Sequence, residues 1–235
     1  MLTANCVHFD GAVVETSPFR HFTIENFVDA DVASALLRWF EHEADWNAKS
    51  IAGLGTLSSV DLHTSELGHQ LGFFTGEPFL SHVRRQMSEL FGKKLEGFVD
   101  LTANRMTQSQ EIGLHNDIST LPPAFRFTHR LVVYLNHQYS EEHGGVLRLT
   151  DAPSPSRSAR PQKRILPVHR CAFGFEISES SYHAIEPVRK GTRYNLSFTF
   201  YPGAGRDDHC LTRAKSRRRK ALSPMVVWTI PRLKP

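Results

Sequence analysis

From Phe98 onward the chain consists of short strand-like segments separated by turn residues. The apolar run at residues 131–135 contains β-branched residues and is typical of a strand buried on both faces. In Arg193–Phe200 hydrophobic and polar residues alternate, which predicts a strand with the arginine on a polar face and the aromatic rings on the opposite face. Residues 146–150 and 171–177 predict two further strands. Many short strands in succession favour a jelly-roll barrel, mainly β with flanking helices, whose mouth can hold a ligand.

Two amphipathic helices are predicted before these strands. Asp29 is expected to be the N-cap of a helix over residues 30 to about 47, where apolar residues recur at helical spacing. Pro78 and Gly92 frame the second helix, because proline is favoured in the first turn and glycine just past the end. Its stripe of methionine and aromatic residues is expected to belong to the core and not to a cofactor site. Both helices are expected to pack on the outside of the sheet.

The segment His115-Asn116-Asp117 is a candidate metal pincer. Side chains at positions i and i+2 of a strand leave the same face roughly 7 Å apart, so His115 and Asp117 can reach one ion while Asn116 points away. A later histidine from another strand, His183, can complete a facial set of three ligands. Two imidazoles and one carboxylate, with positions left open, are typical of non-heme Fe(II) sites. The competing interpretation is an ion pair between His115 and Asp117 within the strand.

Arg193 lies ten residues beyond His183 in the alternating strand. Its guanidinium is planar and permanently charged, so it can bind a dicarboxylate through two parallel hydrogen bonds. The alternative is an ion pair with a surface acid. Most of the other histidines are expected to be surface or core residues without a ligand role, among them His42, His63, His69, His82 and His129.

Four blocks of the chain resemble Fe(II)- and 2-oxoglutarate-dependent oxygenases of the prolyl-hydroxylase-like branch. The blocks are RMTQSQEIGLHND (105–117), RLVVYLN (130–136), EHGGVLRL (142–149) and SYHAIEPVRKGTRYNLSFTF (181–200). They stand in the order that the family has, and the stretch PFRHFTIENFV (18–28) is similar to the family's opening strand and helix. The resemblance covers roughly residues 18–202 and is specific, because chance agreement in both order and spacing is rare.

The resemblance implies a double-stranded β-helix and the use of Fe(II), 2-oxoglutarate and O2, and it leaves ascorbate open as a supporting reductant. It implies that His115, Asp117 and His183 bind the metal, and that Arg193 anchors the distal carboxylate of 2-oxoglutarate. These four residues are the candidate catalytic residues. In related halogenases a small residue stands at the position of Asp117, so the carboxylate favours hydroxylation.

Further contacts to the cosubstrate are implied less directly. Tyr134 matches a tyrosine that helps to hold the same distal carboxylate in the prolyl hydroxylases. Asn195 is a candidate cofactor-binding residue, and Leu147 is a candidate pocket-lining residue. The chain departs from the family pattern at Met106 and Thr107, where the family often has an aromatic residue or a glycine, and at Asn195, where many members have Ser or Ala. None of these departures touches the metal ligands.

The implied activity is a dioxygenase reaction that converts 2-oxoglutarate to succinate and CO2 while it hydroxylates an unactivated C–H bond. The expected substrate is an amino-acid side chain, either peptide-linked or free. Two alternatives stay open: the same chemistry on another small metabolite, by desaturation or cyclisation, and a non-catalytic barrel that binds only a metal or a partner. Release of succinate from 2-oxoglutarate separates the enzymes from the binding module.

Length and composition fit a single oxygenase domain over residues 18–202, with an N-terminal extension at 1–17 and a basic C-terminal extension at 203–235. A chain of 235 residues is long enough for a sizeable core. The formal net charge is only +4, so a nucleic-acid partner is not expected. The oligomeric state is left open.

A cytoplasmic location is expected, without a membrane partner. No run of 18 apolar residues exists, and the N-terminus lacks the basic and apolar regions of a secretory signal. Unevenly spaced cysteines are expected to be free thiols in a reducing compartment, which also suits an enzyme that must keep iron ferrous: Cys6, Cys171 and Cys210.

Three segments are predicted to be irregular. Residues 51–65 contain Gly and Ser and predict loop with at most one strand. Residues 151–164 predict either a solvated connection or a loop that binds an acidic substrate through four basic residues, Arg157, Arg160, Lys163 and Arg164. The run RAKSRRRK (213–220) predicts a solvated basic segment, with a nucleic-acid or acidic partner as the alternative.

Overall fold

The computed structural model describes residues 5–51, 53–119, 126–151, 162–201 and 228–229. Its helices are α1 (Ala30–His42), α2 (Gly68–Leu71) and α3 (Glu77–Phe91), and 3-10 turns lie at Leu62–Thr64, Gly72–Thr75 and Glu141–His143. Its strands are β1 (His21–Ile24), β2 (Asn47–Ile51), β3 (Gly55–Asp61), β4 (Val99–Met106), β5 (Ile112–Ser119), β6 (His129–Tyr134), β7 (Leu147–Thr150), β8 (Lys163–Ile165), β9 (Ala172–Glu176), β10 (Tyr182–Ile185), β11 (Arg193–Phe200) and β12 (Trp228–Thr229).

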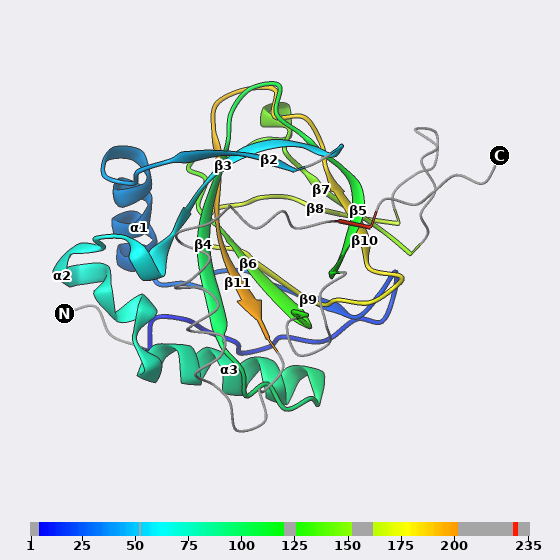
Figure 1. Cartoon of the computed structure of the whole chain (residues 1–235), viewed down its shortest axis with the longest axis horizontal. Helices are drawn as coiled ribbons and strands as arrows, with labels where there is room; N and C mark the ends of the chain where they lie inside the picture. The colour runs from blue at the N-terminus through cyan, green and yellow to red at the C-terminus, as the bar shows by residue number, and fades with distance from the viewer. Residues whose placement is uncertain (1–4, 52, 120–125, 152–161, 202–227, 230–235) are drawn as a thin grey trace.

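The strands form one curled antiparallel sheet. Its order is β1-β9-β6-β11-β4-β3-β5-β10-β7-β8, with β2 paired to β3 and β12 paired to β5. Figure 1 shows the sheet curving into a half-open barrel, with the helices lying on its outer side. Neighbours in this order are often far apart in the sequence, so strands from both halves of the chain meet around one hollow. The predicted double-stranded β-helix is confirmed.

The outer face of the sheet packs against the helices. On β11, Leu196, Phe198 and Phe200 lie in the main hydrophobic core together with residues of α1 and α3. Asn195 and Ser197, which alternate with them, hydrogen-bond to one another on the inner face. The alternation predicted for this strand is confirmed, and it places Arg193 on the inner face, where ligands can reach it.

Helix α1 begins as predicted but is shorter than predicted. Asp29 occupies the N-cap position, yet its carboxylate makes no cap hydrogen bond and instead lies 2.7 Å from His8 Nε2. The helix ends at His42, not near residue 47. Trp46 folds back and donates its indole N–H to Phe40 O at 2.8 Å, and Asn47 begins β2. The aromatic contact with the end of the helix therefore turns the chain into a strand.

The strands on either side of α1 are short. The opening strand within residues 18–28 is β1, and the chain turns after it at Asn26, whose φ is 54°. Residues 51–65 hold one strand, β3, with turns on both sides, as expected; β3 forms a hairpin with β2 just before it, in register from Asn47↔Ser59 to Ile51↔Gly55. Polar residues on both strands hide the hairpin in the sequence, because four of the five β2 residues are exposed.

Helix α3 matches its prediction. Pro78 lies in its first turn, and Gly92 ends it in the left-handed conformation with φ of 62°. A glycine meets no steric penalty there. The predicted apolar stripe is buried in the main core, with Leu90 partly buried: Phe79, Leu80, Val83, Met87 and Phe91. The stripe is core, as expected.

Residues before β1 are part of the packed structure. Cys6, Val7 and Phe9 are buried in the main core, and Val7 pairs with Val28 in an isolated bridge. Cys6 and Cys171 are free thiols, whereas Cys210 lies outside the described residues. None of the helices that the structure describes is both long and apolar enough to cross a membrane.

The basic segments are only partly described. Lys163 begins β8 and pairs with Glu15, and Arg164 reaches Glu141 and Glu186 at 3.6 and 3.7 Å. Two of the four predicted substrate-binding cations are therefore in ion pairs. Arg157 and Arg160 fall within residues 152–161, and the run at 213–220 falls within 202–227, both outside the described residues.

Acid should destabilise the fold through His129. This side chain is 1% exposed and packs on the ring of Phe91 at a centroid distance of 4.8 Å. Burial lowers the pKa of His129 to about 4, with smaller effects from neighbouring charges. The unfolded chain therefore binds an extra proton between about pH 6.5 and pH 4, so stability is lost as the pH falls through that window, by up to about 3 kcal/mol.

Denaturant unfolding of the parent and of His129→Leu at pH 7 and pH 4.5 measures this effect. The variant should lose less stability on acidification than the parent. Equal losses in the two proteins would assign the acid sensitivity to other groups.

Candidate functional site

The candidate ligands lie on two neighbouring strands that face the hollow of the barrel. His115 and Asp117 are two residues apart on β5, and His183 is on β10. In the antiparallel pairing of these strands, His183 is the direct partner of His115. Cross-strand partners project from the same face of a sheet, and the two imidazole rings are 4.3 Å apart between centroids. The sheet register therefore brings the three predicted side chains together.

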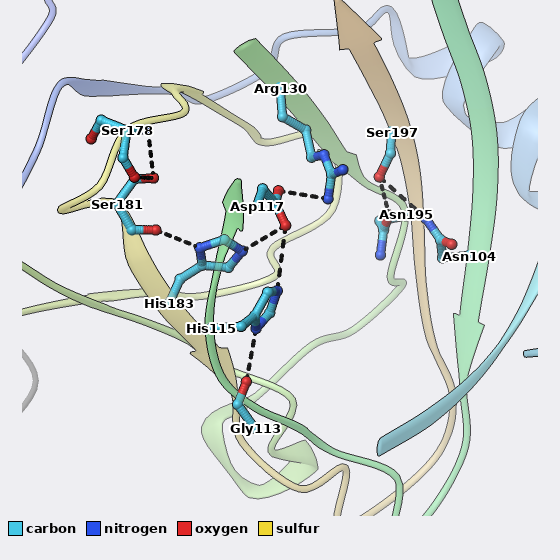
Figure 2. Close-up of polar contacts among 10 residues, drawn as sticks. All are labelled: Asn104, Gly113, His115, Asp117, Arg130, Ser178, Ser181, His183, Asn195 and Ser197. Atoms are coloured by element: carbon cyan, nitrogen blue, oxygen red, sulfur yellow. Dashed lines mark hydrogen bonds and ion pairs between the residues drawn. The ribbon is translucent and has the colours of Figure 1, made fainter. Parts of the chain in front are cut away.

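Backbone carbonyls fix the orientation of both imidazoles. His115 Nδ1 lies 2.8 Å from Gly113 O, and His183 Nδ1 lies 3.0 Å from Ser181 O. A carbonyl can only accept, so each Nδ1 carries the proton and each Nε2 presents a lone pair. This arrangement is typical of metal-ligating histidines, whose other ring nitrogen donates to a carbonyl or a carboxylate. Figure 2 shows both Nε2 atoms directed at the carboxylate of Asp117.

Asp117 lies between the two imidazoles and a cation. Its Oδ1 is 3.5 Å from His115 Nε2 and 3.8 Å from His183 Nε2, while Arg130 Nη1 lies 2.8 Å from Oδ2. Burial alone would raise the pKa of this fully buried carboxyl, but the charge of Arg130 outweighs it and holds the pKa below its ordinary range. Asp117 is therefore ionised, and its two oxygens face different partners.

These three side chains fit a divalent metal. One ligand atom from each lies within 4.8 Å of the others, and all three residues are buried. Burial, with a smaller effect of His115, lowers the pKa of His183 to about 4, so this imidazole is neutral and able to ligate well below pH 6.5. Two neutral imidazoles and one carboxylate suit a first-row metal that keeps open positions.

Arg193 places a buried cation on the inner face of the same sheet. The side chain is 4% exposed, and Nε donates to Gly145 O at 2.9 Å. The guanidinium lies over the ring of Tyr134 at 5.2 Å. None of the described acidic residues pairs with Arg193, whereas a buried charge normally has a partner of opposite sign. The site is thus prepared for an anion, because both the charge and the fork of donors are already held in place.

The backbone near Arg193 is fitted closely to this cation. Gly145 has a φ of 67°, and a Cβ there would lie 2.8 Å from Arg193 Cδ. The hydroxyl of Tyr134 is buried and makes no hydrogen bond to another described residue. Leu147 packs beside Tyr134 in a small hydrophobic cluster. These neighbours leave one polar end, made by Arg193 and the Tyr134 hydroxyl, in an otherwise apolar wall.

A neutral polar group lies farther along the same face. Asn104 Nδ2 donates to Asn195 Oδ1 at 3.1 Å and to Ser197 Oγ at 3.2 Å. Figure 2 shows this group apart from Asp117 and Arg130, beside β4 and β11. Asn195, which the sequence places at the site, is therefore on its inner wall with its carbonyl oxygen already bound.

Comparison with known families gives these residues their context. Residues 101–201 match the model of the 2OG-Fe(II) oxygenase superfamily. The match spans every candidate ligand on β5 and β10 as well as Arg193. Over these residues the chain is similar to the 2OG-Fe(II) oxygenase superfamily. It is a 2-oxoglutarate-dependent oxygenase that uses Fe(II), 2-oxoglutarate and O2. A search of curated proteins finds no match.

Solved structures share the fold of this oxygenase. A prolyl-4-hydroxylase from Pseudomonas putida is 18% identical with a TM-score of 0.59, and the alignment covers 78% of this chain and 93% of that one. A viral collagen prolyl hydroxylase from Paramecium Bursaria Chlorella virus-1, solved with 2-oxoglutarate, is 14% identical with a TM-score of 0.54, covering 78% and 96%.

A third neighbour is a prolyl hydroxylase from Trichoplax adhaerens, solved with a peptide fragment of hypoxia inducible factor. It is 14% identical with a TM-score of 0.59, and the alignment covers 82% of this chain and 86% of that one. At these identities the likeness establishes the fold, which is that of the prolyl-hydroxylase-like oxygenases.

Sequence reasoning missed two cations at the oxygenase site. Arg130 stands four residues before Tyr134 on β6, so the period of two places both on the inner face. This spacing could have indicated that Arg130 faces inward. Its contact with Asp117 depends on the curl of the sheet, which brings β5 close to β6. Lys49 lies on β2, between the helix end expected near residue 47 and the segment expected to be irregular from residue 51.

Proposed function

We propose that this oxygenase hydroxylates an unactivated C–H bond of an amino-acid side chain, either free or peptide-linked. One observation carries the proposal: a buried His-Asp-His set and a buried arginine, which has no acidic partner among the described residues, lie on the inner face of one sheet. The first fits Fe(II), and the second fits the distal carboxylate of 2-oxoglutarate.

We assign the metal to His115, Asp117 and His183. The carbonyls of Gly113 and Ser181 support this role, because they hold both Nε2 lone pairs toward the same point. Asp117 would ligate through Oδ1, since Oδ2 is held by Arg130. A single oxygen from Asp117 leaves more of the coordination sphere open.

We assign the distal carboxylate of 2-oxoglutarate to Arg193, with the Tyr134 hydroxyl as a second donor. Both groups are buried and lie against one another, and neither is bound to an acid among the described residues. Asn195 has a lesser role in this assignment, because its side-chain oxygen already accepts from Asn104 and Ser197. Its amide nitrogen is the part that can face a ligand.

When bound, Fe(II) and 2-oxoglutarate would activate O2, which is the oxidant for attack on an unreactive C–H bond. The protein's own part is to hold these groups and keep water out. Phe173 and Phe175 are fully or almost fully buried beside the site, and the ring of Phe175 contacts His183 at 5.2 Å between centroids. This apolar wall keeps the imidazole dry and strengthens its interactions with the metal and with Asp117.

Hydroxylation is favoured over other outcomes because a carboxylate ligand is present at Asp117, where related halogenases have a small residue. Desaturation or cyclisation of a small metabolite is the alternative, since the same metal centre can support it. The peptide bound to the Trichoplax neighbour makes a peptide-linked side chain a reasonable substrate.

Mass spectrometry tests the proposed reaction. The Fe(II)-loaded protein is incubated with 2-oxoglutarate and O2 against the twenty amino acids, each as the free acid, the N-acetyl acid and the N-acetyl amide. A gain of one oxygen in a substrate, with matching succinate release, is expected. Loss of two hydrogens would favour desaturation or cyclisation, and succinate without any oxidised amino acid would reject an amino-acid substrate. Omission of 2-oxoglutarate is the control.

A further inference from the structure

Lys49 lies on the side of the β2–β3 hairpin that faces the site. Residues 49 and 51 leave the same face of β2, and Lys49 is paired with Leu57 on β3. Ile51 is buried in a cluster with Met106, and Leu57 packs against that cluster. Met106 in turn lies 3.9 Å from Arg193 Nη1. The hairpin therefore lies against the site through its apolar residues, with Lys49 on the same face.

Lys49 combines access to solvent with nearby protein charges. Its side chain is exposed, while loss of hydration is the main cause that lowers its pKa. Arg130, Asp100 and Asp117 also act on it electrostatically, in that order of importance. Because Asp117 is a candidate metal ligand, Lys49 lies on the same side of the sheet as the candidate metal site.

The charge of Lys49 is not used by the protein itself. Within the described part of the chain, Lys49 makes no ion pair or hydrogen bond that meets ordinary distances, whereas Lys93 pairs with Glu176 and Lys94 pairs with Glu96. An ammonium that has lost part of its hydration gains from a bound anion, which can replace the lost water contacts. Arg130 adds to the positive potential on the same side of the hollow, although its guanidinium is held by Asp117.

The charges around the hollow leave room for one anion. Lys49 and Arg130 balance Asp100 and Asp117, and Fe(II) balances the two carboxylates of 2-oxoglutarate. Arg193 then remains as one uncompensated positive charge among the residues named here. A substrate with one carboxylate and no cationic group would make the loaded site neutral, and a free amino acid would still present its carboxylate end to this positive charge.

We propose that Lys49 selects substrates that carry a carboxylate next to the side chain to be oxidised. This inference rests on the proposed function and narrows it to a free amino acid or the C-terminal residue of a peptide, and it excludes an internal residue. A carboxylate held by Lys49 at the mouth would leave the side chain directed toward the metal ligands. Lys49 would thus be a specificity-determining residue that touches the substrate.

Calorimetry on the Ni(II)-loaded protein with 2-oxoglutarate tests this without turnover. The probes are again the twenty amino acids as free acids, N-acetyl acids and N-acetyl amides. At least one residue type should bind as an acid roughly tenfold more tightly than as its amide, as expected for a charge-assisted contact. Preference for the free acid identifies a free amino acid, and equal binding of the two acids identifies a peptide C-terminus.

Substitutions then test whether Lys49 causes the preference for the acid over its amide. Lys49→Gln should weaken binding of the acid about tenfold and leave the amide unchanged, while Lys49→Arg should retain most of the preference. Lys94→Gln removes the same charge from an exposed position and should change neither. Any one of three results would overturn the inference. The parent could bind acid and amide equally, Lys49→Gln could keep the preference for the acid, or no probe could bind at all.

The proposed hydroxylation and the proposed role of Lys49 can be rejected independently of each other. An acid that binds through Lys49 but gains no oxygen in the Fe(II) enzyme would reject hydroxylation of that substrate and leave the role of Lys49 intact. Amides that are oxidised as well as the acids would support hydroxylation and reject the role of Lys49.

Discussion

Replacing both His115 and His183 by alanine should abolish stoichiometric binding of Fe(II) to this oxygenase. The two imidazoles are two of the three candidate ligands, and both Nε2 lone pairs are aimed at the same point by backbone carbonyls. Changes to groups that merely orient a ligand cost about ten- to hundredfold in metal affinity, so the loss of two ligands should exceed about a hundredfold. Elemental analysis after loading under anaerobic conditions and removal of free metal measures the result.

A matched control removes two histidines that have no ligand role. His42 and His69 are exposed, so His42→Ala with His69→Ala should retain one metal ion per chain. Ni(II) and Zn(II) should follow the same pattern as Fe(II), because affinity for such sites rises along the first-row series. Circular dichroism confirms that each variant is folded. Full metal content in the His115→Ala/His183→Ala protein would show that the metal binds elsewhere.

Arg193→Gln should raise the KM for 2-oxoglutarate by roughly ten- to hundredfold, because a hydrogen bond to a charged group contributes about 1.5–3 kcal/mol. The substitution keeps a polar side chain against Gly145 O but removes the charge and the fork of donors. Metal content should stay at the parent's level, since Arg193 does not contact the three ligands. Initial rates of succinate formation at varied 2-oxoglutarate concentration measure the effect.

Two further variants separate charge from geometry at this position. Arg193→Lys keeps the charge but loses the planar pair of donors, so its KM should lie between those of the parent and Arg193→Gln. Tyr134→Phe removes only the hydroxyl and should raise the KM by less than Arg193→Gln does. An unchanged KM in Arg193→Gln would mean that the anchor for 2-oxoglutarate is another residue.

The side chains on the inner face of the barrel could be predicted where the periodicity of a single strand determines their direction. The period of two fixes which side chains of β11 face the hollow, and it puts His115 and Asp117 on one face of β5. His183 joined them through its place in a family block, and the cross-strand register then explains why it meets His115. Local periodicity and the order of the blocks were sufficient for these residues.

What the sequence did not predict depends on contacts between distant segments. Arg130 meets Asp117 only because the sheet curls and brings β6 opposite β5. The end of α1 is set by Trp46, whose indole returns to the helix, and helical spacing alone extended the helix too far. Lys49 was overlooked because the polar residues of the β2–β3 hairpin give no alternating hydrophobic signal. Such features require the tertiary structure.

The central claim is that the His-Asp-His set and Arg193 form a single site in which metal and 2-oxoglutarate bind together. Calorimetric titration of 2-oxoglutarate into the parent with and without Ni(II), and into the two variants above, tests it most directly. We expect one 2-oxoglutarate per chain in the Ni(II)-loaded parent, much weaker binding without metal or in His115→Ala/His183→Ala, and weak binding in Arg193→Gln despite full metal content. Equally tight binding of 2-oxoglutarate by the metal-free and the Ni(II)-loaded parent would contradict it.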